Sequence, residues 1–147
     1  MCYIDFMKKY EILEHKADLK IRAFGKTKEE LFLNMLLGMK ESQKAEVVPE
    51  KVKREIKIKA LNLEILLVDF LSEVLYLIQV NKEIYNSVKF KKFTDPSTGS
   101  GQAEIEGELI GQKVERFGED IKAVTYHGLE IRQRKDGTWE ATVLFDI

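Results

Sequence analysis

The stretch EHKADLKIRAF, from Glu14 to Phe24, places two carboxylates, a histidine and two lysines around the start of an alternating segment. Asp146 stands in LFDI at the other end of the chain, although aspartate is disfavoured inside strands. If the strand that ends at Ile147 pairs with the strand that begins at Asp18, these two side chains and the terminal carboxylate converge. Like charges at short distance need a cation, and oxygen donors alone favour Ca²⁺ or Mg²⁺ over zinc. The alternative is a solvated chain end without an ion.

Most familiar catalytic patterns are missing from the sequence. No serine stands in a nucleophile-elbow context, no cysteine lies near a histidine, and the patterns CxxC and HExxH do not occur. The two histidines, His15 and His127, are each predicted at a strand-to-turn junction, where a structural hydrogen bond is the commoner role. A metal-dependent hydrolase is disfavoured, because only His15 or Glu14 offers a general base. The carboxylates near strand ends are therefore the remaining candidates for a functional site.

Composition narrows the class of protein. The chain has 147 residues, 44% of them hydrophobic, which suits one globular domain with a real core. Its 24 basic and 25 acidic residues give a net charge of -1, so direct nucleic-acid binding is disfavoured unless a local patch supplies it. The single cysteine, Cys2, predicts a reducing, cytoplasmic setting. We expect no secretory signal, because Asp5, Lys8 and Lys9 interrupt the amino-terminal run. We expect no membrane span, because acids interrupt the longest apolar run, Leu61 to Val80.

The first part of the chain alternates between apolar and polar residues and then shows the apolar spacing of a helix. Residues 10–15 and 18–24 are predicted to be strands. Thr27 and Glu30 have the capping-box spacing, in which each side chain reaches the other's backbone amide, so a helix is predicted to start at Thr27. Its apolar face contains a methionine-rich stripe, which favours core packing over a partner groove. The stripe consists of Leu31, Phe32, Met35, Leu36 and Met39.

The centre of the chain contains a lysine-rich strand and a strongly apolar helix. Residues 45–51 are predicted to be a polar connection, and residues 52–60 a strand with lysines on its outer face. That face is typical of solvated surface, with a docking site as the alternative. Asn62 is predicted to cap the next helix, which is apolar on more than half its circumference and should be buried.

The last part of the chain is predicted to form two hairpins. Residues 85–93 and 102–109 flank the loop TDPSTGSG, and residues 121–133 and 138–147 flank a turn at Asp136-Gly137. Together with the two helices, this pattern predicts a single α+β domain with a mixed, largely antiparallel sheet packed on two long helices.

Four separated segments resemble the archease family in the right order. They are LEHKADLKIRAFGKTKEELFLNM, DFLSEVLYL, KAVTYHGLEI and the terminal ATVLFDI. Two departures occur: Lys16 stands where the family usually has threonine or serine, and Phe70 where tryptophan is frequent. Neither departure removes a carboxylate. The resemblance begins close to residue 7, so residues 1–6 are predicted to be an amino-terminal extension and residues 7–147 the archease-like domain.

The resemblance implies an activator protein and not an independent enzyme, with no catalytic residues of its own. Archeases assist the RtcB-type RNA ligase of tRNA splicing by promoting its guanylylation and multiple turnover, so the implied partner is that ligase, with tRNA reached only through it. Family members bind a divalent ion, typically calcium, through residues that correspond here to Asp18, Asp146 and Ile147. The resemblance implies Ca²⁺ as the bound ion, with Mg²⁺ or another divalent ion in the cell as the alternative.

Four further residues are expected to contact the partner. Glu14 and His15 shape the turn before Asp18, while Lys122 and His127 lie in the segment KAVTYH. The alternative function is a chaperone-like interaction module with a structural calcium ion, which the lysine-rich strand and the methionine stripe would suit.

Overall fold

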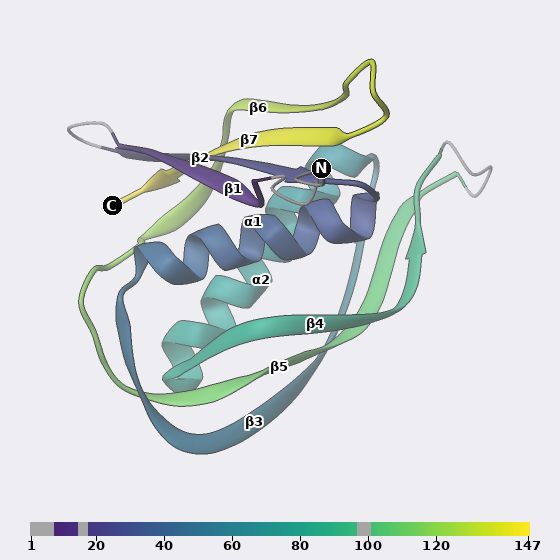
Figure 1. Cartoon of the computed structure of the whole chain (residues 1–147). Helices are drawn as coiled ribbons and strands as arrows, with labels where there is room; N and C mark the ends of the chain where they lie inside the picture. Colours follow the sequence, from purple (N-terminus) through teal and green to yellow (C-terminus); the bar gives the residue numbers. More distant parts are fainter. Residues whose placement is uncertain (1–7, 15–17, 97–100) are drawn as a thin grey trace, which may run out of the picture.

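The structure, a computed structural model, describes residues 8–14, 18–96 and 101–147. Its elements follow the chain in this order: β1 (Tyr10–Glu14), β2 (Asp18–Gly25), α1 (Lys28–Ser42), β3 (Ala45–Ala60), α2 (Leu63–Asn81), β4 (Glu83–Thr94), β5 (Ala103–Phe117), β6 (Ala123–Gln133) and β7 (Trp139–Asp146). Four strands form one sheet in the order β1-β2-β7-β6, and the other three form a second sheet in the order β3-β5-β4. The two helices lie between the sheets (Figure 1).

The predicted α+β class with two helices is confirmed, and the prediction of one mixed sheet is corrected to two sheets. Every strand pair in the described ranges is antiparallel. The helices explain the division, because each contacts strands of both sheets: α1 contacts β1, β2, β7 and β4, and α2 contacts β6, β3, β4 and β5. A helix that is apolar on most of its circumference must be covered from more than one side.

Helix α1 begins where local chemistry predicts. Thr27 is its N-cap, and the Thr27 hydroxyl accepts a hydrogen bond of 3.1 Å from the Glu30 backbone N–H. The return bond differs from the predicted capping box, since Glu30 Oε1 accepts from the backbone N–H of Lys26 at 2.7 Å. The methionine stripe is core, as predicted, because Met35 and Met39 have no exposed surface.

Helix α2 is the central buried helix, as predicted. The Asn62 side chain caps it by accepting a hydrogen bond of 2.9 Å from the Ile65 backbone N–H. Its buried face spans most of its circumference and consists of Leu66, Leu67, Val68, Phe70, Leu71, Val74, Leu75 and Ile78. No helix in the described ranges is long and apolar enough to cross a membrane.

Strand β3 starts seven residues earlier than predicted, because residues 45–51 are part of it and not a polar connection. The register with β5 shifts between Glu46 and Val47 and again between Val47 and Lys51. Pro49 lies inside this irregular part of an edge strand, where its missing N–H costs no ladder hydrogen bond. The predicted lysine face is confirmed, since the four lysines of the strand are exposed and Ile56 and Ala60 are buried.

Both predicted hairpins are present. Strand β4 pairs with β5, and β6 pairs with β7 through a turn in which Gly137 has φ 92°. The β6–β7 turn is closed by a hydrogen bond of 2.8 Å from Arg134 N–H to Thr138 O. Strand β7 then runs back between β6 and β2, which places the carboxyl-terminal residues beside the start of β2 (Figure 1).

Candidate functional site

Asp18 and Asp146 are direct neighbours across two paired strands. Strands β2 and β7 are antiparallel, and their register sets Asp18 opposite Asp146. The β-carbons of directly opposed residues lie about 4.5 to 5.5 Å apart and project from the same face of a sheet. Since Leu19 and Ile21 are buried in the core, the two aspartates project from the face away from the helices. The condition on which the sequence argument depended, pairing of the last strand with the second, is therefore confirmed.

The environments of the two carboxylates differ. Oδ1 of Asp18 is buried and has no hydrogen-bond partner among the described residues, whereas Asp146 is exposed. A buried carboxylate oxygen without a donor loses hydration and gains nothing in return, and a second carboxylate opposite adds repulsion. A cation between the two side chains would remove both penalties. The available donors are oxygens, which fit a hard cation such as Ca²⁺ or Mg²⁺.

The two aspartates alone do not complete a metal site. Within the described ranges, no group of three or more histidine, cysteine, aspartate or glutamate side chains is placed to hold a metal ion. Calcium takes about six to eight oxygen ligands in proteins. The third predicted ligand, Ile147, directly follows Asp146 in the sequence. The name candidate ion site is used below for Asp18, Asp146 and Ile147.

A hollow lies next to Asp18 on the same face of the sheet. Its volume is about 270 Å³. Lys20, Thr142 and Leu144 come from β2 and β7, and His127 and Gly128 come from β6. The hollow brings His127, one of the predicted partner-contact residues, to the same surface as Asp18. It therefore links two residues that the sequence analysis singled out separately.

The remaining predicted contact residues have different outcomes. Lys122 is exposed and lies one residue before β6, and its backbone N–H donates a hydrogen bond of 2.7 Å to Asp146 O. The predicted placement of His127 at a strand-to-turn junction is wrong. It lies inside β6, in the irregular part where the register shifts between Thr125 and Glu130, and it is exposed. Glu14 ends β1 opposite Leu19, and His15 lies outside the described residues.

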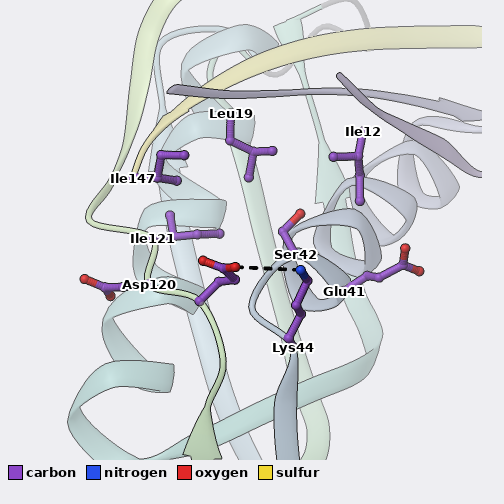
Figure 2. A pocket seen from close by; sticks show the side chains of 9 residues that line it. Ile12, Leu19, Glu41, Ser42, Lys44, Asp120, Ile121 and Ile147 are labelled. Carbon is purple, nitrogen blue, oxygen red and sulfur yellow. Dashed lines mark ion pairs between the residues drawn. The ribbon is translucent and has the colours of Figure 1, made fainter. Parts of the chain in front are cut away.

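A second cavity, the terminal cavity, opens on the core side of the same end of the sheet. It has a volume of about 360 Å³ and is lined by Ile12, Leu19, Glu41, Ser42, Lys44, Glu119, Asp120, Ile121 and Ile147. Figure 2 shows these side chains arranged around it, with Ile147 and Leu19 near the sheet and Glu41 and Ser42 on the end of α1. Ile147, predicted as a metal ligand, is 47% exposed and lines this cavity.

Acidic groups surround the terminal cavity. The Tyr10 hydroxyl donates a short hydrogen bond to Glu41 Oε1. Burial of Tyr10 and this bond to a carboxylate together raise the pKa of the phenol to about 12. Lys44 Nζ lies 3.7 Å from Glu119 Oε1, so one acid of the rim is paired. Asp120 is exposed and has no ion pair among the described residues.

Sequence reasoning missed the terminal cavity. One signal was present, because Glu41 stands in the last turn of a predicted helix, where the macrodipole disfavours a carboxylate. A second was the adjacent acidic pair, Glu119 and Asp120, just before a predicted strand. Neither signal could show that these residues meet, because they lie far apart in the sequence and only the packing of α1 against the sheet brings them together.

Comparison with known proteins shows that this chain is similar in sequence to archeases. The sequence profile of the archease protein family matches residues 10–147. A protein archease from Methanosarcina barkeri is 39% identical, with 95% of this chain and 97% of the relative covered. A protein archease from Pyrococcus furiosus is 32% identical, with 96% of this chain and 100% of the relative covered.

Two solved structures have the same fold. Protein 1598 of Methanobacterium thermoautotrophicum, solved in solution, superposes with a TM-score of 0.74 at 28% identity and covers 96% of this chain and 100% of its own. A crystal structure of a Thermotoga maritima protein, described as an archease and possible chaperone, gives a TM-score of 0.66 at 21% identity, with 92% and 94% covered.

Proposed function

This chain belongs to the archease family, and from that premise we propose that it is an activator of the RtcB-type RNA ligase of tRNA splicing. In this role it promotes guanylylation of the ligase and its repeated turnover, and it reaches tRNA only through the ligase. Proteins of the family are named as archeases, and one as a possible chaperone, but not as enzymes. The proposal therefore assigns the chain no reaction of its own. It also places the chain in a reducing, cytoplasmic setting, which the single cysteine predicts.

The observation that supports a divalent ion in this role is the buried Oδ1 of Asp18, which lies opposite Asp146 and has no hydrogen-bond partner in the part of the chain that the structure describes. We propose that Asp18, Asp146 and the carboxylate of Ile147 hold Ca²⁺, or Mg²⁺ in its place. When bound, the ion supplies positive charge that neutralises the three carboxylates. Asp18 orients the ion from a fixed strand position, and Lys122 fixes the strand end through its bond to the Asp146 carbonyl. His127 lines the adjacent hollow, which supports the proposal that it contacts the partner. Glu14, His15 and Lys122 are proposed as further partner contacts.

A chaperone-like interaction module with a structural calcium ion is the second candidate. The exposed lysine face of β3 favours it, because a charged, solvated sheet face suits transient contact with many acidic clients. The methionine stripe no longer supports this candidate, since Met35 and Met39 are fully buried.

Formation of the covalent guanylyl adduct on the ligase tests the proposal. This protein is added in substoichiometric amount with calcium present, and the initial rate of adduct formation is measured. The expected result is faster adduct formation with the wild-type protein and loss of most of that stimulation with Asp18→Ala. Glu115→Ala serves as the control, because Glu115 is an exposed acid on β5 outside both cavities, and it should stimulate fully.

No stimulation by the wild-type protein would contradict the proposal. Suppression of the aggregation of a heated client protein, without stimulation of the ligase, would support the chaperone-like candidate instead.

A further inference from the structure

Three arginines surround one buried glutamate on the outer face of the four-stranded sheet. Glu140 lies in β7, opposite Phe24 of β2 on one side and Arg132 of β6 on the other. Its neighbour Ala141 belongs to the core, so Glu140 projects from the face away from the helices, which lie on the other face of this sheet (Figure 1). The Glu140 side chain is nevertheless only 8% exposed. The name arginine cluster is used below for Arg22, Arg132 and Arg134.

The three guanidinium groups converge on the Glu140 carboxylate. Arg132 donates hydrogen bonds to Oε2 from Nε at 3.3 Å and from Nη2 at 3.1 Å. Arg22 Nε lies 3.9 Å from the same oxygen, and Arg134 Nε lies 3.4 Å from Oε1. The guanidinium carbon of Arg134 also lies 5.3 Å from the centroid of the Phe24 ring. One buried acid therefore holds together side chains that come from β2, from β6 and from the turn after β6.

The arginine cluster carries more positive charge than this acid neutralises. Three guanidiniums share one carboxylate, and no other acid of the described residues forms an ion pair with them. Glu11, which lies opposite Arg22, pairs with Lys8 at 3.3 Å. The bases that border this part of the face also outnumber the acids: the bases are Lys8, Lys20, Arg22, Arg132, Arg134 and Lys135, and the acids are Glu11, Glu130, Asp136 and Glu140.

The arginine cluster also keeps hydrogen-bond donors available to solvent. Arg22 Nε donates to Thr142 Oγ1 at 3.4 Å, and the terminal nitrogens of Arg22 and Arg134 donate no hydrogen bond to the described residues. The side chains of Arg22, Arg132 and Arg134 are 39%, 61% and 48% exposed. Glu140 thus orients the guanidiniums from below, while their outer edges face water.

This arrangement matches a phosphate group better than a carboxylate. A carboxylate has two oxygens in one plane and pairs with a single guanidinium fork. A phosphate group directs its oxygens tetrahedrally, so it can accept hydrogen bonds from guanidiniums that approach from several sides. Arginine is the usual residue for such recognition, because its planar fork is rigid and always charged.

We propose that the arginine cluster binds a phosphate group through the outer nitrogens of its guanidiniums. The backbone of RNA and a free nucleotide such as guanosine triphosphate are the two sources of this group. A direct contact of this kind goes beyond the proposed function, in which tRNA is reached only through the ligase. It also supplies a local basic patch in a chain whose net charge of -1 gives no general attraction for RNA.

The first test uses the wild-type protein alone, with EDTA present so that no divalent ion occupies the candidate ion site. The Nε–H NMR signals of Arg22, Arg132 and Arg134 are followed during titration with tripolyphosphate, guanosine triphosphate and a uridine dodecamer RNA. A hexaglutamate peptide is the matched carboxylate probe. The phosphate probes are expected to shift these signals at much lower concentration than hexaglutamate. The tighter of RNA and guanosine triphosphate identifies the source of the phosphate.

The second test compares two double variants that each remove two positive charges. Arg22→Gln with Arg134→Gln leaves Arg132 bonded to Glu140, whereas Lys53→Gln with Lys59→Gln removes exposed lysines from β3 of the other sheet. The arginine variant should bind tripolyphosphate about tenfold or more weakly, and the lysine variant should bind it like wild type. Thermal midpoints of both variants check that they are folded.

Three results would each overturn the phosphate site. They are an absence of shifts with every phosphate probe, shifts with hexaglutamate at the same concentrations as with tripolyphosphate, and equal weakening in the two double variants. The first two are measured on the wild-type protein, so they decide the proposal even where a variant is unstable. Hexaglutamate binding at the cluster would instead indicate an acidic protein partner.

Discussion

At the scale of single residues, the candidate ion site depends on two aspartates with different roles. Asp18 is half-buried at the start of β2, and its buried Oδ1 has no hydrogen-bond partner among the described residues, whereas Asp146 is exposed. Replacing Asp146 with alanine removes a donor and creates no cavity in the core. We expect Asp146→Ala to weaken calcium binding at least tenfold, an effect of about 1.4 kcal/mol, and to leave the thermal midpoint of the calcium-free protein close to that of wild type. Isothermal titration calorimetry with calcium measures the affinity.

Asp136→Ala is the control for that experiment, because Asp136 lies in the turn at the other end of β7. Unchanged calcium affinity in Asp146→Ala would remove Asp146 from the site.

Glu83 is a buried acid that the candidate site does not use. Its carboxylate accepts two hydrogen bonds from Arg54, at 2.9 and 2.7 Å, and a third of 2.7 Å from the Tyr85 hydroxyl. The paired Arg54 guanidinium, followed by the Tyr85 hydroxyl, lowers the pKa of Glu83 from 4.5 to about 2 despite burial. Because this carboxylate binds protons more weakly in the folded state, its contribution to stability is complete above pH 4.5 and is lost as the pH falls toward 2.

The free energy of unfolding, measured by urea titration between pH 7 and pH 2, should therefore fall more steeply in wild type than in Glu83→Gln below pH 4.5. At pH 7 the variant should be the less stable protein, since the amide leaves Arg54 without its charged partner. Parallel pH profiles for the two proteins would show that Glu83 does not titrate as described.

The two aspartates of the candidate ion site could be predicted from the sequence, whereas the buried Glu83 could not. Asp18 and Asp146 stood out because aspartate is disfavoured inside strands, and their pairing followed once the last strand was set beside the second. Glu83 gave no such signal. Its burial depends on Arg54 of β3, which lies 29 positions away, and on Lys113 of β5, whose Nζ lies 3.4 Å from Glu83 Oε2.

At the scale of elements, α2 contributes eight buried apolar side chains. Leu71 lies on its buried face, has no exposed surface and belongs to the hydrophobic core. Leu71→Ala should lower the free energy of unfolding by about 2 to 5 kcal/mol, through lost transfer free energy and the cavity that remains. Tyr76→Ala is the matched control on the same helix, because Tyr76 is 57% exposed, and its cost should stay below about 1 kcal/mol. Urea unfolding with an unchanged m-value distinguishes the two outcomes. A cost below about 1 kcal/mol for Leu71→Ala would contradict the position of α2.

The same elements show which boundaries a sequence can predict. The starts of α1 and α2 were predicted because Thr27 and Asn62 cap their helices through hydrogen bonds to residues only three positions away in the sequence. The start of β3 was not, because its first residues are strand only through pairing with β5, as in Ala45 opposite Phe117. The division into two sheets was missed for a similar reason. Periodicity predicts an amphipathic or buried element, but not which other elements cover it.

At the scale of the whole molecule, the candidate ion site and the terminal cavity lie at the same end of the layered fold. The candidate ion site lies on one face of the four-stranded sheet, and the terminal cavity lies on the other face, between the sheet and the end of α1. Strand β7 runs in the middle of that sheet, so its last residues reach both faces. This placement puts the carboxyl-terminal residues between the candidate ion site and the terminal cavity.

Extending the chain by several glycine and serine residues after Ile147 tests that link. The extension moves the terminal carboxylate away from Asp18 and crowds the terminal cavity, but Ile147 and Asp146 are exposed, so no core contact is lost. We expect an unchanged thermal midpoint of the calcium-free protein, weaker calcium binding, and a sharp loss of ligase stimulation in the guanylylation assay. An equally long extension at the amino terminus, where residues 1–6 are themselves predicted to be an extension, is the control and should stimulate fully. The chaperone-like candidate predicts equal activity for both extended proteins in suppressing client aggregation. Full ligase stimulation by the carboxyl-terminally extended protein, with calcium present and at matched concentration, would show that the carboxyl end only completes the fold.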